Sequence, residues 1–93
     1  MRSYEFTALF RVKEDNYTTG LKAVKEIFEK ANVTVVSEED LGDRLLAYPV
    51  NKEERGHYQL LNIEVDPAAI SKIEESLKLT TELLKYLFVK KEK

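Results

Sequence analysis

The sequence contains no cysteine and a single histidine, His57, and this narrows the chemistry open to the chain. Without cysteine, a disulfide, a thiolate nucleophile and a cysteine metal site are all excluded. A zinc centre lacks its usual ligands, and we expect His57 to be structural. The three glycines, Gly20, Gly42 and Gly56, stand too far apart to form a phosphate-binding loop. We therefore expect no catalytic residue, no metal, no cofactor and no small-molecule substrate.

Long hydrophobic runs and an excess of positive charge are absent too. No run approaches the roughly 20 apolar residues of a transmembrane helix. The first residues include Arg2, Ser3 and Glu5, where a signal peptide would be apolar. We therefore expect a cytoplasmic protein that does not contact membranes. Because the formal net charge is −2, nucleic-acid binding would need local basic clusters or a basic partner.

Ninety-three residues suffice for a single domain with one modest core, and we predict one domain over residues 1–93. Residues 3–12 place apolar side chains at every second position, which predicts a half-buried strand. Residues 15–19 are rich in capping residues, and apolar residues then recur at helical spacing over residues 21–31. This pattern predicts a helix with Asn32 as its C-terminal cap.

The β-branched residues 33–36 predict a second strand, which resumes at residues 44–48 after the acidic cluster of residues 38–40. Such a cluster could bind a cation, but its spacing does not match a calcium loop. We interpret it as a solvated bulge or bend. Pro49 cannot donate to a β-ladder, so this strand is expected to lie at a sheet edge or to end there.

Residues 57–65 predict a third strand, and the pair Asp66-Pro67 marks the start of a second helix. A final apolar run over residues 83–89 predicts the fourth strand. The order strand, helix, strand, strand, helix, strand is a βαβ unit used twice, joined at residues 42–58. It predicts an α+β, ferredoxin-like split βαβ fold: a four-stranded antiparallel sheet with the first and third strands central and both helices on one face.

An open sheet face of this kind is the RNA-binding surface of an RRM, in which aromatic residues of the central strands stack on bases. The candidates here are Tyr4, Phe6 and Phe10 on the first strand and Tyr58 on the third. The third strand, however, holds one aromatic residue and neither Lys nor Arg, unlike an RRM. Alternating aromatic residues are also what a core needs, and we favour the core interpretation for the first strand.

A more specific pattern lies between Arg44 and Tyr58. It resembles the signature of the bacterial small-subunit ribosomal protein six family, and the similarity extends to the opening residues, the length, the element order and the Val-Lys ending. The residues that carry it are Met1-Arg2-Ser3-Tyr4-Glu5, Leu46-Ala47-Tyr48-Pro49-Val50, Lys52, Gly56-His57-Tyr58 and Val89-Lys90. The chain departs from the family in having Asp43 and Leu45 beside Arg44, where basic residues are usual.

The resemblance implies a ferredoxin-like fold, no enzymatic activity and a place in the platform of the small ribosomal subunit. There the family forms a heterodimer with the small basic ribosomal protein eighteen, and the pair binds the central domain of 16S ribosomal RNA. The basic partner would supply positive charge that this chain lacks.

The resemblance and the side-chain chemistry together nominate seven RNA-binding residues. They are Arg2, Arg44 and Lys52 as phosphate contacts, Lys90 and Lys91 as further cations, and Tyr4 and Tyr48 as stacking or hydrogen-bonding groups. The competing interpretation makes the cations solvated surface charges and the tyrosines core residues. The competing function is a ferredoxin-like module that senses a small molecule or binds another protein, which would need a ligand pocket at a dimer interface.

Overall fold

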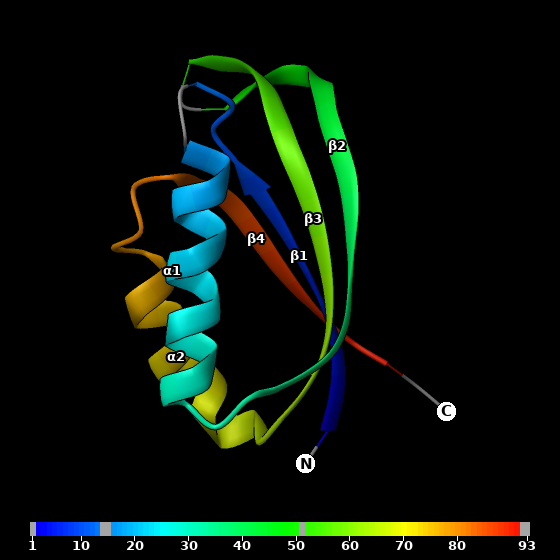
Figure 1. The fold of residues 1–93 in the computed structure, drawn as a ribbon, viewed down its shortest axis with the longest axis vertical. Coiled ribbons are helices and arrows are strands. Elements are labelled where there is room, and N and C mark those ends of the chain that lie inside the picture. The colour runs from blue at the N-terminus through cyan, green and yellow to red at the C-terminus, as the bar shows by residue number, and fades with distance from the viewer. Residues whose placement is uncertain (1, 14–15, 51, 92–93) are drawn as a thin grey trace.

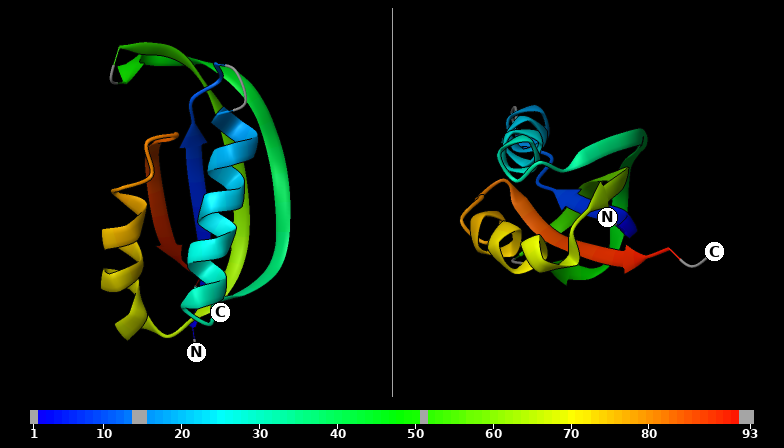
Figure 2. Two further views of the ribbon diagram at one scale, coloured as in Figure 1. Left: turned by 60° about the vertical axis from the view of Figure 1, so that its left-hand side comes forward. Right: turned by 90° about the horizontal axis from the view of Figure 1, so that it is seen from below.

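The computed structural model describes residues 2–13, 16–50 and 52–91. Its elements are β1 (Arg2–Phe10), α1 (Asn16–Lys30), β2 (Thr34–Val50), β3 (Glu53–Val65), the 3₁₀ turn η1 (Pro67–Ala69), α2 (Ile70–Leu77) and β4 (Leu83–Lys90). The strands pair antiparallel in the order β2-β3-β1-β4, and both helices cover one face of the sheet (Figures 1 and 2). The predicted ferredoxin-like split βαβ fold is confirmed, with β1 and β3 in the centre. None of the described helices is long and apolar enough to span a membrane.

The core lies between the sheet and the two helices. Phe6 and Phe10 of β1, Leu61 and Ile63 of β3, and Phe28 of α1 are each at most 1 % exposed. The rings of Phe6 and Phe28 meet edge to face, with 5.1 Å between their centroids. Full burial of a side chain of this size contributes about 1.5–3 kcal/mol. The alternating aromatic residues of β1 therefore form the core, as the sequence favoured.

The residues predicted to end the first helix and to begin the second, Asn32 and Asp66-Pro67, do so in the structure. Asn32 adopts a left-handed φ of 60° just after α1, as a C-terminal cap does. The Asp66 carboxylate accepts a hydrogen bond from the Ala68 N–H at 3.0 Å, and Pro67 takes the first helical position. This cap begins a 3₁₀ turn, and the α-helix follows from Ile70.

Strand β2 differs from the expected two pieces. It runs without a break through the acidic cluster, and three register shifts against β3 accommodate the change in direction, one of them between Asp40 and Gly42. The cluster bends the strand without ending it. Pro49 lies near the end of this edge strand, as its missing N–H predicted.

Strands β2 and β3 continue past the end of the central strand. The last residue pair of β1 with β3 is Phe10 with His57, whereas pairing between β2 and β3 continues to Val50 with Glu53. The described residues within 44–55 therefore form a two-stranded projection without β1 beside it, which we call the arm. The arm curves over the end of β1 at the top of Figure 1.

Helix α1 packs very closely on the sheet at Gly20. A Cβ atom at this position would lie 2.6 Å from the Phe10 ring and 2.9 Å from the Glu82 Cβ. Because Phe10 is fully buried, its ring has no space to move into. We expect Gly20→Ala to lower the free energy of unfolding by about 1–3 kcal/mol through overpacking, although alanine favours helix more than glycine does.

Urea unfolding measures this change. The matched control is Thr19→Ala, at an exposed position of the same helix, which we expect to leave stability within about 0.5 kcal/mol of the original. If Gly20→Ala stabilised the protein as helix propensity alone predicts, the close approach of α1 to Phe10 would be wrong.

Candidate nucleic-acid interface

The arm brings together three of the predicted RNA-binding residues. Arg44, Tyr48 and Lys52 are all exposed, and Tyr48 retains 67 % of its accessible surface. Lys52 sits in the turn of the hairpin with a left-handed φ of 67°, which tight hairpin turns require. The Arg44 Nε donates to the Leu41 carbonyl at 3.3 Å, which holds the guanidinium beside its strand. With Arg55, which is exposed too, the arm presents three cations and one aromatic ring, the groups that contact phosphates and bases.

The remaining predicted cations lie at the opposite end of the sheet. Arg2 begins β1, and Lys90 ends β4. The Lys91 N–H donates to the Ser3 carbonyl at 2.9 Å, so the first residues of β1 and the end of β4 lie side by side. All three basic residues are exposed. Because the length of β1 separates them from the arm, the predicted cations form two groups.

Tyr4 belongs to the helix-covered side of the sheet. It is partly buried and packs against the core. Its ring meets Phe88 edge to face at a centroid distance of 6.4 Å. Core packing therefore explains the position of Tyr4, and its contact with RNA stays a prediction.

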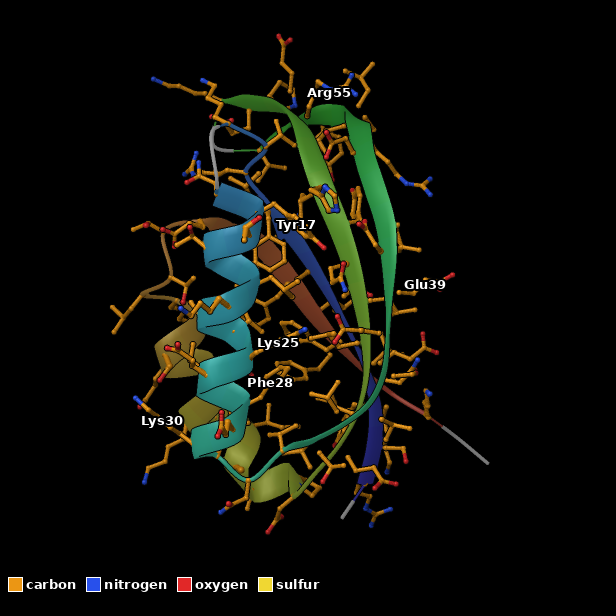
Figure 3. The ribbon with its side chains drawn as sticks, in the orientation of Figure 1. Tyr17, Lys25, Phe28, Lys30, Glu39 and Arg55 are labelled. Atoms are coloured by element: carbon orange, nitrogen blue, oxygen red, sulfur yellow. The ribbon has the colours of Figure 1, made fainter. Side chains whose placement is uncertain are left out.

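A polar group at the base of the arm was missed by sequence reasoning. The His57 Nδ1 lies 2.6 Å from Asp43 Oδ1, and its Nε2 lies 2.5 Å from Asp40 Oδ1. The Tyr17 ring stacks on the imidazole at a centroid distance of 3.6 Å, and its hydroxyl donates to Gln59 Oε1 at 2.7 Å. Figure 3 shows Tyr17 on α1 with its ring directed toward the sheet. We call these five residues the His57 cluster.

The bend in β2 explains why the sequence did not reveal this cluster. Asp40 and Asp43 are three residues apart, so a regular strand would place them on opposite faces. The register shift beside Gly42, whose φ is 82°, brings both to the face that carries His57. The acidic cluster is nevertheless exposed at all three positions, as the predicted solvated bend requires, and Glu38 also forms an ion pair with Lys25 of α1 at 2.8 Å. The described residues hold no group of three or more His, Asp or Glu suited to a metal ion.

Hydrogen bonds and nearby charges shift two pKa values in this region. The Gly42 N–H donates to Asp40 Oδ1 at 2.8 Å, and this bond, aided by His57, holds the pKa of Asp40 below its ordinary value although burial opposes the shift. Burial, followed by the negative charges of Asp40 and Glu38, raises the pKa of Tyr17. The Tyr17 phenol therefore stays protonated at neutral pH and remains a hydrogen-bond donor.

The face of the sheet opposite the helices carries a shallow apolar hollow. Its volume is about 390 Å³, and its lining includes Leu9, Tyr58, Lys85 and Leu87. The arm extends this surface, because Tyr48 lines an adjoining cavity of about 140 Å³ that shares Leu9, Tyr58 and Lys85. This open face is therefore continuous with the arm.

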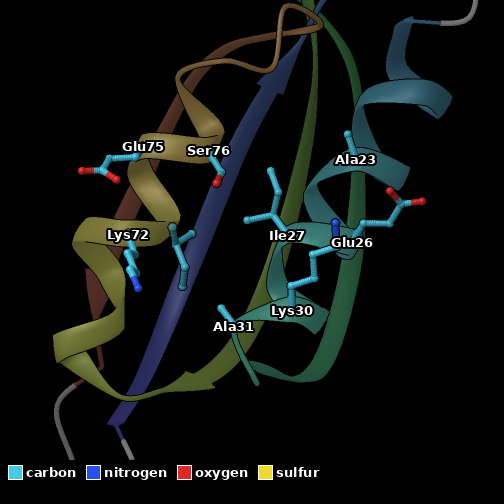
Figure 4. A pocket seen from close by; sticks show the side chains of 9 residues that line it. Ala23, Glu26, Ile27, Lys30, Ala31, Lys72, Glu75 and Ser76 are labelled. Atoms are coloured by element: carbon cyan, nitrogen blue, oxygen red, sulfur yellow. The ribbon is translucent and has the colours of Figure 1, made fainter.

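A second groove lies between the two helices (Figure 4). Its floor includes Ile27 and Ile73, and its volume is about 530 Å³. Lys30 and Lys72 line it together with Glu26 and Glu75. Because the two signs of charge balance there, the groove does not offer the basic surface that a phosphate chain needs.

Comparison with known proteins identifies close relatives. A family model described as ribosomal protein S6 matches residues 3–90. The chain is 45 % identical over 92 residues to small ribosomal subunit protein bS6 of Treponema denticola, with 99 % of each chain covered. It is 39 % identical over 90 residues to bS6 of Leptospira biflexa, with 97 % of each covered.

Solved structures show the same fold. The 30S ribosomal protein S6 of Thermotoga maritima superposes with a TM-score of 0.87 at 20 % identity, covering 97 % of this chain and 87 % of that one. A chain from the complex of the chemotaxis kinase CheA P2 domain with CheY reaches a TM-score of 0.66 at 12 % identity, covering 97 % and 98 %. At these identities the likeness concerns the fold alone.

The lowered pKa of Asp40 makes a prediction about acid stability. The charged carboxylate contributes stability above its ordinary pKa of 3.8, and this contribution is lost as the pH falls through the lower folded-state pKa. We expect Asp40→Asn to be less stable than the unmodified protein near neutral pH, and the difference to shrink below about pH 3.8.

Thermal unfolding at a series of pH values measures the difference. Glu39→Gln is the matched control, since it removes one carboxylate charge from the neighbouring position, and Glu39 points away from the helices (Figure 3). A stability difference for Asp40→Asn that did not change with pH would contradict the role assigned to the carboxylate charge.

Proposed function

This chain belongs to the ribosomal protein S6 family, and we propose that it binds the central domain of 16S ribosomal RNA as a heterodimer with the small basic ribosomal protein eighteen. As a member of the family it is a structural, non-enzymatic component of the small ribosomal subunit, and it would act in the bacterial cytoplasm. The observation that best supports the proposal is a largely apolar open face that continues into an arm carrying cations.

The open face suits a basic protein partner. Strand register places Glu5, Glu39 and Glu64 on this face, and Lys85 lines the hollow itself. Leu87 and Val89 lie on the same face and are 59 % and 46 % exposed. Exposed apolar side chains on a face that also carries carboxylates can complement a surface that is itself apolar and basic. Partner binding would cover this face next to the arm.

The arm would supply phosphate contacts next to that partner. Arg44 and Lys52 can approach phosphates as exposed cations, and Tyr48 offers a ring for stacking. Because the net charge of the chain is −2, these few contacts alone would bind RNA weakly at physiological salt. The basic partner would therefore raise the affinity of the pair for RNA.

Leu87→Glu tests the open face. A carboxylate there would be desolvated against the partner, so we expect at least about tenfold weaker heterodimer formation by calorimetry. Leu79→Glu is the matched control, because Leu79 is 82 % exposed but lies after α2, outside this face. Equal affinity for the two variants would show that the partner does not use the open face.

Lys52→Gly tests the arm. Glycine adopts the positive φ of this turn without strain, so the variant removes the charge while preserving the turn. For the heterodimer on a 16S central-domain fragment, we expect the slope of log K against log salt to become less negative by roughly 0.7–0.9. Lys72→Ala, on the helix side, should leave the slope unchanged.

An unchanged slope for Lys52→Gly would exclude a phosphate contact at Lys52. The proposed heterodimer has its own test, which is the affinity of the isolated chain for the same RNA fragment. Tight binding at physiological salt with no gain from the partner would contradict it.

A further inference from the structure

We propose that the His57 cluster locks the arm in one direction and that His57 is a positioning residue for RNA binding. It would do so by fixing where the arm presents Arg44, Tyr48 and Lys52. The consequence for binding depends on the function proposed above. The locking itself is a property of the free chain and can be measured without any ligand.

The arm needs such a lock because no third strand pairs with it. Beyond the pair of Phe10 with His57, no described residue of β3 pairs with β1, and the strands of the arm pair only with each other. An isolated two-stranded hairpin is marginally stable in water. The direction of the arm therefore depends on contacts at its base.

The cluster lies where β2 bends into the arm. The register shift and the left-handed Gly42 stand between Asp40 and Asp43. His57, on the neighbouring strand, contacts one carboxylate on each side of this bend, at 2.5 and 2.6 Å. The imidazole thus spans the bend. A change in the angle of the bend would move at least one of the two carboxylates away from the ring. Both contacts are hydrogen bonds at the same time only when both ring nitrogens carry hydrogen.

The same cluster joins the bend to α1. Tyr17 covers the imidazole with an interplanar angle of 24°, and its hydroxyl bonds to Gln59, which is 2 % exposed. The helix itself packs on the core through Phe28. Directional contacts therefore connect the base of the arm to a helix that packs on the buried core.

Other contacts hold the arm without fixing its angle as closely, and one is the cavity that Tyr48 lines with Leu9 and Lys85. Arg11 Nη1 lies 3.3 Å from Glu53 Oε2 in a partly exposed ion pair, and such pairs are weak because water screens them. Leu9 packs directly on the backbone of Gly56, where an added Cβ atom would overlap the Leu9 side chain. That contact is apolar and has little directional preference. The directional restraint comes from the His57 cluster.

His57→Phe is the test, because phenylalanine keeps the ring against Tyr17 and removes both hydrogen bonds. Amide hydrogen exchange of the free chain should be about tenfold faster in the arm. Exchange in β1 should change only as much as the global free energy of unfolding changes. Tyr86→Phe is the matched control, since it removes one hydrogen bond of 2.9 Å between β4 and Glu74 of α2, away from the arm. Asp43→Asn removes the charge of one of the two carboxylates that contact His57, and it should raise the exchange rate of the arm by a smaller factor.

Binding is then measured with the heterodimer and the 16S central-domain fragment, under conditions where every variant is folded. We expect about tenfold weaker RNA binding for His57→Phe, a smaller loss for Asp43→Asn, and none for Tyr86→Phe. Unchanged arm exchange in His57→Phe would overturn the lock. Faster arm exchange with unchanged RNA affinity would overturn the positioning role. If the unmodified chain bound neither partner nor RNA, the proposed function would fail, while the exchange measurement would still decide the lock.

Discussion

The short central strand is the constraint on which the rest of the structure depends. β1 has nine residues, whereas β2 has 17 and β3 has 13. Where β1 is present, its aromatic side chains join sheet and helices in one core. Where it ends, the two longer strands lose their neighbour and become the arm. The division between a rigid body and a projecting element follows from this difference in strand length.

One-sided packing is the second consequence of the same architecture. The two helices cover a single face of the sheet, so the other face keeps apolar side chains such as Leu87 in contact with water. A small domain has too little chain to cover both faces. An exposed apolar surface of this kind is typical of a protein that works as part of an assembly. Folding buries the apolar side chains on one face of the sheet, and assembly would bury those on the other face.

Sequence periodicity was enough to predict the element order, the central strands, the edge position of Pro49 and the cap at Asp66. It failed where a local irregularity changed which side chains share a face. Asp43 appeared in the sequence as an acidic departure from the family beside Arg44, but the structure pairs it with His57. The contact of Tyr17 with Gln59 joins elements 42 residues apart and has no local signal in the sequence. The separation of the basic residues into two groups likewise depended on strand lengths that composition could not supply.

The pairing of β1 with β4 bears on how the chain becomes folded during synthesis. Phe6 lies opposite Phe88, so one side of the central strand has no neighbour until residues 83–90 have been made. The hairpin of β2 and β3, by contrast, closes between residues near in sequence, and such local contacts form quickly. An incomplete chain on the translating ribosome would therefore expose an unpaired edge of β1 with its aromatic side chains. Release of the last strand from the exit tunnel, rather than formation of either helix, would be the step that completes the native sheet.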